Sequence, residues 1–345
     1  MKLKQIHRAW LLVLLLAGAR LRAESADAPA PYKGAAGPFK VETAEYDWRD
    51  TNRNRMVPVK IYYPASGNGP FPVIIFSHGL GGSREGYEYL GRHWASAGYV
   101  SVHVQHIGSD DSVWRDVPLV DRMRAMGAAA RDPRNIMNRP KDISLAIDEV
   151  LKMNGADGPL KGRLDTGRIG VAGHSFGAFT TLAVAGEVFT TPLGLEMSMA
   201  DPRVKAAIAM SSPAPKNPKD YDTAFSGIKI PCFHMTGTLD DSPIGGTKAA
   251  ERRVPFDHSK GADAYLLTFN GGDHMVFSGR LRGPGREMDE KFQPLILMSS
   301  TAFWDAYLKD NALAKAWLAG DFGKVLGEAG TFEKKLPTAA GKTKE

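Results

Sequence analysis

Short apolar runs of strand length alternate along the chain with segments of helical periodicity. Residues 72–77 (PVIIFS) are almost entirely apolar, which is typical of a strand covered on both faces. Residues 143–153 (ISLAIDEVLKM) carry apolar side chains at helical spacing. This repeated alternation predicts a mostly parallel central sheet with helices on both faces. The expected strands are residues 56–63, 72–77, 99–104, 168–172, 204–210, 228–235 and 264–269, and the expected helices are residues 85–98, 143–153, 175–185 and 292–308.

Composition excludes several other classes of protein. The chain has 345 residues, of which 43% are hydrophobic and 24% charged, as in a globular protein with one large or two small domains. Its single cysteine, Cys232, excludes an intramolecular disulfide and a zinc site built from several thiolates. Five of the 44 basic side chains and none of the 38 acidic ones lie in the first 23 residues. The remainder is nearly neutral and gives no reason to expect a nucleic-acid partner.

The N-terminal segment has the pattern of a secretory signal peptide. Basic residues precede a short apolar run at residues 9–17 (AWLLVLLLA), and the cleavage pattern A-x-A follows at residues 17–19. The apolar run is too short to span a bilayer. We therefore expect residues 1–23 to be removed, which leaves an exported protein, periplasmic or extracellular, with no integral membrane segment. An uncleaved N-terminal anchor is the alternative.

The rest of the chain divides into three predicted segments. Residues 24–40 (ESADAPAPYKGAAGPFK) are rich in Ala, Pro and Gly, a composition typical of a linker. Residues 41–322 contain the alternating strands and helices and are predicted to form one catalytic domain. Residues 323–345 are predicted to form a flexible C-terminal tail for the same compositional reasons.

Residues 173–177 read GHSFG and match the pattern G-x-S-x-G. An expected strand runs directly into this pattern and an expected helix of small residues runs directly out, which is the strand–turn–helix context that the pattern needs. A serine on so tight a turn takes a strained backbone, and side chains in place of the flanking glycines would clash. We predict Ser175 as a nucleophile.

A serine hydroxyl is a poor nucleophile until a base takes its proton. His274 follows the expected strand at residues 264–269 and precedes the final helix. That is where the base belongs when the chain order is serine, acid, histidine. His258 is the competing histidine, but it precedes the same strand. We therefore predict His274 as the base.

The acid that orients the imidazole should follow the strand at residues 228–235. Two adjacent aspartates, Asp240 and Asp241, compete for this role. We favour Asp240, three residues after Gly237, and keep Asp241 as the alternative. The other role open to Asp241 is to cap the next turn with its side-chain oxygens.

Negative charge that develops on a substrate oxygen needs backbone N–H donors. The residue after the nucleophile, Phe176, offers one. The loop HGLGGS at residues 78–83, called the oxyanion loop below, follows an expected strand and should offer the other. We favour Leu80 for this second donor, with Gly79 next.

Two motifs resemble a known family. FSHGLGG at residues 76–82 and GHSFGA at residues 173–178 resemble the platelet-activating-factor acetylhydrolase branch of the alpha/beta-hydrolases, which includes bacterial proteins often called predicted dienelactone hydrolases. The resemblance covers about residues 45–310 and implies an alpha/beta-hydrolase fold with carboxylic-ester hydrolase activity. It implies the nucleophile Ser175, the acid Asp240, the base His274 and the oxyanion donors Leu80 and Phe176.

The chain also departs from that family pattern. True dienelactone hydrolases use a cysteine nucleophile, whereas position 175 is serine. Residues 108–140 form a long polar segment without a recognisable counterpart. Both departures leave the substrate class open.

The sequence predicts an exported serine esterase that works through an acyl-enzyme on short-chain or acetyl esters. Its partner would be a small-molecule or lipid-like ester, and the chemistry requires no metal and no organic cofactor. One alternative is a polyester or cutinase-like hydrolase with an open groove. The other is a catalytically silent hydrolase fold used for binding, which the intact set of three side chains disfavours.

Overall fold

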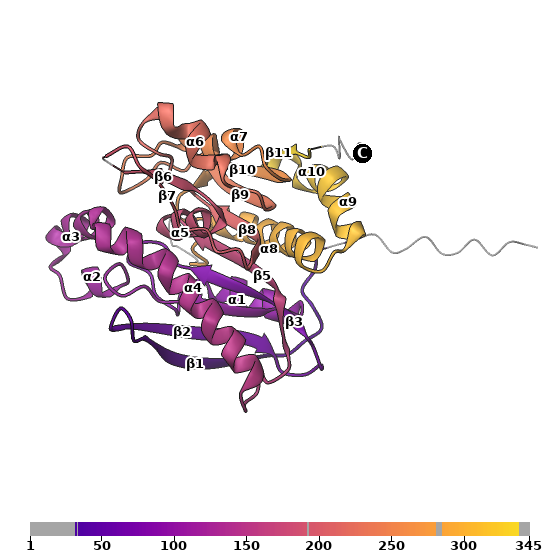
Figure 1. Cartoon of the computed structure of the whole chain (residues 1–345). Helices are drawn as coiled ribbons and strands as arrows, with labels where there is room; N and C mark the ends of the chain where they lie inside the picture. Colours follow the sequence, from indigo (N-terminus) through magenta and orange to yellow (C-terminus); the bar gives the residue numbers. More distant parts are fainter. Residues whose placement is uncertain (1–31, 33, 192, 281–284, 338–345) are drawn as a thin grey trace, which may run out of the picture. The chain divides into compact units, whose positions relative to one another are not determined.

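The computed structural model describes residues 32, 34–191, 193–280 and 285–337, and the predicted signal peptide lies outside them (Figure 1). Within these residues, nine strands form one sheet in the order β1-β2-β4-β3-β5-β8-β9-β10-β11, and β6 and β7 form a separate hairpin. The strands are β1 (Val41–Asp50), β2 (Arg55–Pro64), β3 (Phe71–Ser77), β4 (Val100–Val104), β5 (Leu164–His174), β6 (Val188–Thr190), β7 (Glu196–Ser198), β8 (Val204–Met210), β9 (Cys232–Leu239), β10 (Ala264–Asp273) and β11 (Gly330–Lys335).

The central part of the sheet is parallel. Neighbouring strands from β4 across to β10 run in the same direction, whereas β1, β2 and β11 pair antiparallel at the two edges. Strand β3 shows why its sequence is apolar. Ile74 and Phe76 belong to the core on one face, and Val73 and Ile75 belong to the core on the other. The predicted mostly parallel sheet is confirmed.

Helices cover both faces of this sheet (Figure 1). Trp94 of α1 and Trp304 of α8 pack edge to face at 5.9 Å on one side, whereas Ile143 and Ile147 of α4 pack on the other. Within the described part of the chain, none of the helices has both the length and the apolar character needed to cross a bilayer. The α-helices are α1 (Glu88–Ser96), α2 (Ser112–Arg115), α3 (Leu119–Arg131), α4 (Pro133–Gly155), α5 (Phe176–Ala185), α6 (Tyr221–Ser226), α7 (Val254–His258), α8 (Arg286–Leu308), α9 (Ala312–Gly320) and α10 (Phe322–Leu326).

Helix α4 begins well before the helix expected at residues 143–153. Pro140 lies inside α4, although proline removes a backbone donor and usually ends a helix. The helix begins instead at Pro133, where a missing N–H costs little, and the Asp132 side chain accepts a hydrogen bond from the backbone N–H of Arg134. Residues 108–140 therefore contain α2, α3 and the first turns of α4.

The flexible tail predicted from residue 323 is wrong up to Lys335, because α10 and β11 occupy most of that stretch. Strand β11 pairs antiparallel with β10. Its Phe332 ring lies 4.8 Å from Phe322, 5.8 Å from Tyr265 and 5.9 Å from Phe233. Pairing with β10 and the packing of this aromatic ring together order an edge strand whose composition otherwise suggests a loose end.

Candidate active site

Ser175 lies at the turn where β5 ends and α5 begins. Its backbone has φ 56° and ψ −115°, a conformation that is strained for a residue with a side chain. A Cβ atom on Gly173 would lie 2.3 Å from the carbonyl oxygen of Gly177, and one on Gly177 would lie 1.9 Å from that of Ser77. Close backbone neighbours therefore require both flanking glycines, as predicted.

The structure brings Ser175, His274 and Asp240 together. Nε2 of His274 lies 2.9 Å from Oγ of Ser175, and Nδ1 of His274 lies 2.7 Å from Oδ1 of Asp240. Because a carboxylate only accepts hydrogen bonds, Nδ1 donates to Asp240 and Nε2 is left to accept from the serine hydroxyl. The three residues lie at or just after the ends of β5, β9 and β10, so the parallel sheet itself gathers them at one edge.

The two competing residues lie in other surroundings. Asp241 is half exposed, accepts from Nζ of Lys248 at 2.9 Å and caps the following turn by accepting from the backbone N–H of Ala249 at 2.9 Å. His258 on α7 forms a 2.8 Å pair with Asp222 instead. Geometry thus distinguishes the adjacent aspartates, which sequence reasoning had left open.

A buried arginine, Arg252, supports Asp240 from a second side. Its Nη2 lies 3.4 Å from Oδ1 of Asp240, and its Nε donates to the Asp240 backbone carbonyl at 3.1 Å. The hydroxyl of Thr236 donates to the other carboxylate oxygen at 2.8 Å. Burial alone would raise the pKa of Asp240, but the hydrogen bond from His274 and the charge of Arg252 together lower it. Asp240 is therefore an anion beside the imidazole.

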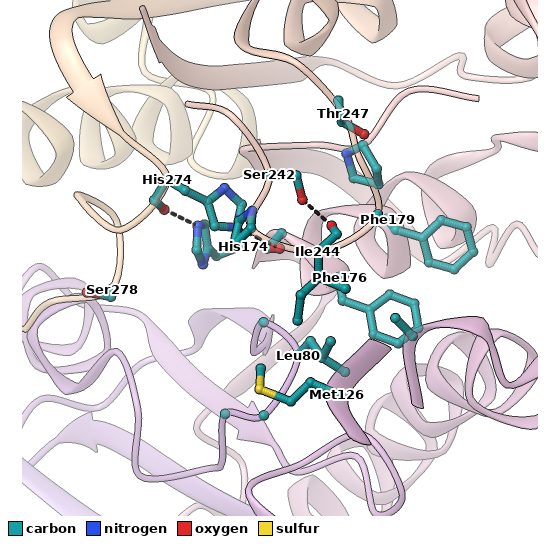
Figure 2. Close-up of a pocket in the computed structure, with 18 of the residues that line it drawn as sticks. Leu80, Met126, His174, Phe176, Phe179, Ser242, Ile244, Thr247, His274 and Ser278 are labelled. Carbon is teal, nitrogen blue, oxygen red and sulfur yellow. Dashed lines mark hydrogen bonds between the residues drawn. The ribbon is translucent and has the colours of Figure 1, made fainter. Parts of the chain in front are cut away.

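His174, the residue before the predicted nucleophile, hydrogen-bonds to the loop that contains His274. Its Nε2 donates to the His274 backbone carbonyl at 2.8 Å (Figure 2). Its Nδ1 is then the acceptor for the hydroxyl of Tyr87 at 2.8 Å. Burial, followed by the nearby His274, lowers the pKa of His174 to about 3, so this ring stays neutral.

The two predicted oxyanion donors line one pocket (Figure 2). Phe176 is the first residue of α5, and the first N–H groups of a helix have no acceptor within it. The backbone N–H of Leu80 donates no hydrogen bond within the described residues. Both N–H groups are therefore available to a ligand oxygen.

Arg139 of α4 is fully buried beneath the oxyanion loop, and sequence reasoning missed it. Its guanidinium donates to the backbone carbonyl of His78 and to three hydroxyl oxygens: Ser109 at 2.8 Å, Thr180 at 2.9 Å and Ser77 at 3.1 Å. All four acceptors are uncharged. Arg139 precedes a proline in the polar segment 108–140, which has no recognisable counterpart in the family pattern. No sequence motif there indicates a buried or functional arginine.

The same guanidinium also reaches the other predicted donor. It lies 4.5 Å from the centroid of the Phe176 ring, and the Thr180 hydroxyl donates to the Phe176 carbonyl at 2.9 Å. Burial lowers the pKa of Arg139 to about 9, so Arg139 is still a cation at neutral pH. Arg139 thus ties together the two backbone segments expected to hold an oxyanion.

These residues open into a pocket of about 1790 Å³. Its walls come from the oxyanion loop, α3, β6 and segments that follow β8, β9 and β10. Figure 2 shows Met126, Phe179 and Ile244 among the side chains that line it. Helix α3 lies in the segment without a recognised counterpart, so that segment forms part of the pocket wall. In the described residues, no group of three or more His, Cys, Asp or Glu side chains could hold a metal ion.

Comparisons with known proteins find two groups of similar proteins. The family model for platelet-activating factor acetylhydrolase, isoform II, matches residues 49–117. A platelet-activating factor acetylhydrolase from Cavia porcellus is 31% identical over 157 residues, covering 38% of this chain and 35% of the relative. The protein of the same name from Canis lupus familiaris is 26% identical over 247 residues, covering 62% of this chain and 51% of the relative.

A second group of relatives has a different name. Cutinase 2 from Thermobifida cellulosilytica is 24% identical over 180 residues, which are 52% of this chain and 52% of the relative. The chain thus spans between about a third and a half of the length of the curated relatives it matches.

The sheet order and these similarities decide the fold together. The chain has the alpha/beta-hydrolase fold. The family match contains the first of the two motifs, at residues 76–82, so the predicted resemblance to platelet-activating-factor acetylhydrolases is confirmed.

Proposed function

We propose that the chain is a serine carboxylic-ester hydrolase, with Ser175 as nucleophile, His274 as base and Asp240 as orienting acid. The observation that carries this proposal is the hydrogen-bonded series from Ser175 through His274 to Asp240, which opens into a pocket. The names of the relatives, acetylhydrolase and cutinase, support the same class of reaction.

The geometry suggests a two-step reaction. In the first step Oγ of Ser175 attacks the ester carbonyl while Nε2 of His274 takes its proton, and the backbone N–H groups of Leu80 and Phe176 bind the oxyanion. The imidazolium is stabilised by Asp240 and then protonates the departing alcohol, which leaves an acyl-serine. In the second step His274 activates water in the same way, and the acid is released.

Short-chain or acetyl esters are the proposed substrates, and the names of the acetylhydrolase relatives favour them. We also propose that residues 1–23 direct export of the chain. Mass spectrometry of protein recovered outside the cytoplasm would locate the new N-terminus, and an intact Met1 on all exported protein would contradict cleavage.

The direct test compares 4-nitrophenyl acetate hydrolysis by the wild-type protein and by Ser175→Ala. We expect the variant to lose at least roughly 10³-fold in kcat, because the nucleophile is absent. Ser278→Ala is a matched control, because Ser278 also lines the pocket and its Oγ accepts from the backbone N–H of Arg280 and, within the described residues, makes no hydrogen-bond contact with Ser175, His274 or Asp240. Equal rates for wild type and Ser175→Ala, or failure of a fluorophosphonate to label Ser175, would favour a silent binding protein.

A polyester or cutinase-like hydrolase is the second candidate. The cutinase relatives and the size of the pocket favour it. Release of soluble monomers from a polyester film, measured beside hydrolysis of 4-nitrophenyl acetate, separates the two candidates. Monomer release by wild type and none by Ser175→Ala would assign polymer hydrolysis to the same site.

A further inference from the structure

A row of hydrogen bonds that the reaction above does not use connects the oxyanion loop to the base. The backbone N–H of Gly79 donates to the hydroxyl oxygen of Tyr87 at 3.4 Å, and that oxygen lies 2.8 Å from Nδ1 of His174. Nε2 of His174 lies 2.8 Å from the backbone carbonyl oxygen of His274 (Figure 2). This row therefore joins the loop that contains one predicted oxyanion donor to the residue predicted to take the proton of Ser175.

The two ends of the row fix its polarity. The His274 carbonyl oxygen can only accept, so Nε2 of His174 carries the ring proton, and Nδ1 is left as a lone pair that needs a donor. Within the described residues, the Tyr87 hydroxyl is the one group that hydrogen-bonds to this nitrogen. The Gly79 N–H can only donate, so it binds the Tyr87 oxygen and leaves the hydroxyl proton for His174.

Burial keeps both side chains in the protonation state that this polarity requires. The pKa of His174 falls to about 3, because the ring is buried and lies near His274. Burial raises the pKa of Tyr87 to about 12. At neutral pH the imidazole is therefore uncharged and the hydroxyl keeps its proton.

The backbone of Tyr87 is strained in a way that favours a role for its side chain. Its φ of 61° and ψ of 26° lie in the left-handed region, which a bulky residue rarely adopts and glycine adopts freely. Such strain persists where the surrounding structure requires it, and it gathers at functional sites. The Tyr87 ring is buried and lies 4.7 Å from the Phe76 ring, so its hydroxyl is held at a fixed place beside His174.

We propose that Tyr87 is a positioning residue, whose hydroxyl selects the tautomer of His174 that holds the backbone of His274 in place. With its proton on Nε2, His174 donates to the His274 carbonyl. With its proton on Nδ1, two acceptors would face each other there, and the buried Tyr87 proton would have no acceptor among its described hydrogen-bond partners. This inference rests on the proposed esterase function and deepens it.

The tautomer can be read without measuring activity. Nitrogen NMR of protein labelled with ¹⁵N distinguishes protonated from unprotonated ring nitrogens, and through-bond correlation to the backbone assigns the His174 ring. In wild type at pH 7 we expect an uncharged His174 with its proton on Nε2. A proton on Nδ1, or a charged ring, would overturn the proposal whatever any variant does.

Tyr87→Phe keeps the ring and removes only the hydroxyl. We expect a mixture of both His174 tautomers and a roughly 5- to 30-fold lower kcat on 4-nitrophenyl acetate, with KM changed less than about threefold. Tyr265→Phe is the matched control, because Tyr265 is buried, its hydroxyl bonds to that of Tyr307 at 2.8 Å, and it does not line the pocket. The control should leave the tautomer unchanged and kcat within about threefold of wild type.

A double-mutant cycle tests whether Tyr87 acts through His174. His174→Asn removes the ring nitrogen that binds the His274 carbonyl. In that background Tyr87→Phe should lower kcat by less than about threefold more, because both substitutions break the same connection. An undiminished loss in the double variant would show that Tyr87 acts by another route and would overturn the proposal.

The remaining outcomes separate the positioning role from the enzyme. Unchanged kcat in folded Tyr87→Phe, or an equal loss in Tyr265→Phe, also overturns the positioning role and leaves the esterase intact. Absence of Ser175-dependent hydrolysis by wild type would instead reject the proposed function, and the NMR measurement would still report the tautomer of His174.

Discussion

Each side of Ser175 contains one buried arginine, and the two differ in what they touch. Arg252 contacts the carboxylate of Asp240 at 3.4 Å, so its charge has an opposite charge beside it. Arg139, under the oxyanion loop, makes its four hydrogen bonds only to uncharged oxygens and stacks on Phe176. The charge of Arg252 is thus paired directly, whereas that of Arg139 is hydrogen-bonded to no carboxylate and feels Asp142 and Asp110 only at longer range.

This difference matches what each side is expected to do. The acid–base side must hold a carboxylate and an imidazole in fixed orientation, and an ion pair achieves that. The oxyanion side must favour negative charge that exists only during the reaction, and a buried cation that is hydrogen-bonded to no carboxylate favours it without reorganisation. The contrast can be tested by removing each group in turn.

The largest effect is expected from the acid. Asp240→Asn should lower kcat roughly 10³- to 10⁴-fold, because the amide no longer holds the proton of His274 on Nδ1. Asp241→Asn is the matched control, since Asp241 caps a turn at the surface, and should change kcat less than about threefold. Steady-state kinetics on 4-nitrophenyl acetate measures both. A larger loss in Asp241→Asn would reverse our assignment of the acid.

Removal of Arg139 should have the next largest effect. Arg139→Met leaves the His78 carbonyl without its donor and takes positive charge from beneath the oxyanion loop. We expect kcat to fall roughly 10- to 100-fold and the free energy of unfolding to fall by about 2–4 kcal/mol. Urea unfolding gives the second quantity. Affinity for a trifluoromethyl ketone, whose adduct carries the oxyanion, should fall more than affinity for the substrate.

Arg252→Met serves as the comparison for that variant. It leaves the Asp240 carboxylate without its cation, so the pKa of Asp240 should rise. A lowered pKa in the folded protein contributes stability above the ordinary value of 3.8, and this stability is lost as pH falls through the folded pKa. Arg252→Met should therefore be less stable at neutral pH, and it should lose less stability than wild type as pH falls below 3.8. The same decrease in acid-dependent loss in Arg139→Met would remove the distinction between the two arginines.

A smaller effect tests the charge of the oxyanion side directly. His106 donates from Nδ1 toward Asp142 at 3.0 Å and lies 2.9 Å from the Ser77 hydroxyl, which also binds Arg139. Burial, followed by the charge of Arg139, lowers the pKa of His106 from 6.5 to about 4. Below pH 6.5, His106 is protonated in the unfolded chain but not in the folded protein. The free energy of unfolding should therefore fall as pH falls from 6.5 toward 4.

His106→Gln removes this titration and keeps a neutral hydrogen-bonding side chain. The slope of unfolding free energy against pH between about 6 and 4 should decrease by up to roughly 1.4 kcal/mol per pH unit. Urea unfolding at several pH values checks the slope. An unchanged slope would show that titration of His106 does not cause the loss of unfolding free energy at acid pH.

The sequence predicts the sheet and the residues of the site better than it predicts the supports behind them. Local sequence patterns identify Gly173, Ser175 and His274. The first two belong to the G-x-S-x-G motif, and the third follows a predicted strand. Asp240 and Asp241 could not be separated by pattern alone, since only the direction of the chain after β9 decides which carboxyl faces the imidazole.

Arg139 and Arg252 left no comparable pattern. Each is a charged residue of a kind usually found at the surface, and each is buried only because distant segments cover it. Pro140 further concealed the first turns of α4, because a proline inside a helix depends on tertiary support. Likewise, β11 depends on tertiary contacts, namely its pairing with β10 and the ring contacts of Phe332.

The bond from His174 to the carbonyl of His274 has a consequence for how this protein can diverge. The segment that follows His274 borders the pocket, so its length and composition are free to adapt to new ligands. The carbonyl of His274 is hydrogen-bonded to His174, which directly precedes Ser175. Changes in the segment after His274 therefore need not move the His274 imidazole away from the Ser175 hydroxyl. A graft of residues beyond Phe277 should therefore alter substrate choice before it alters turnover.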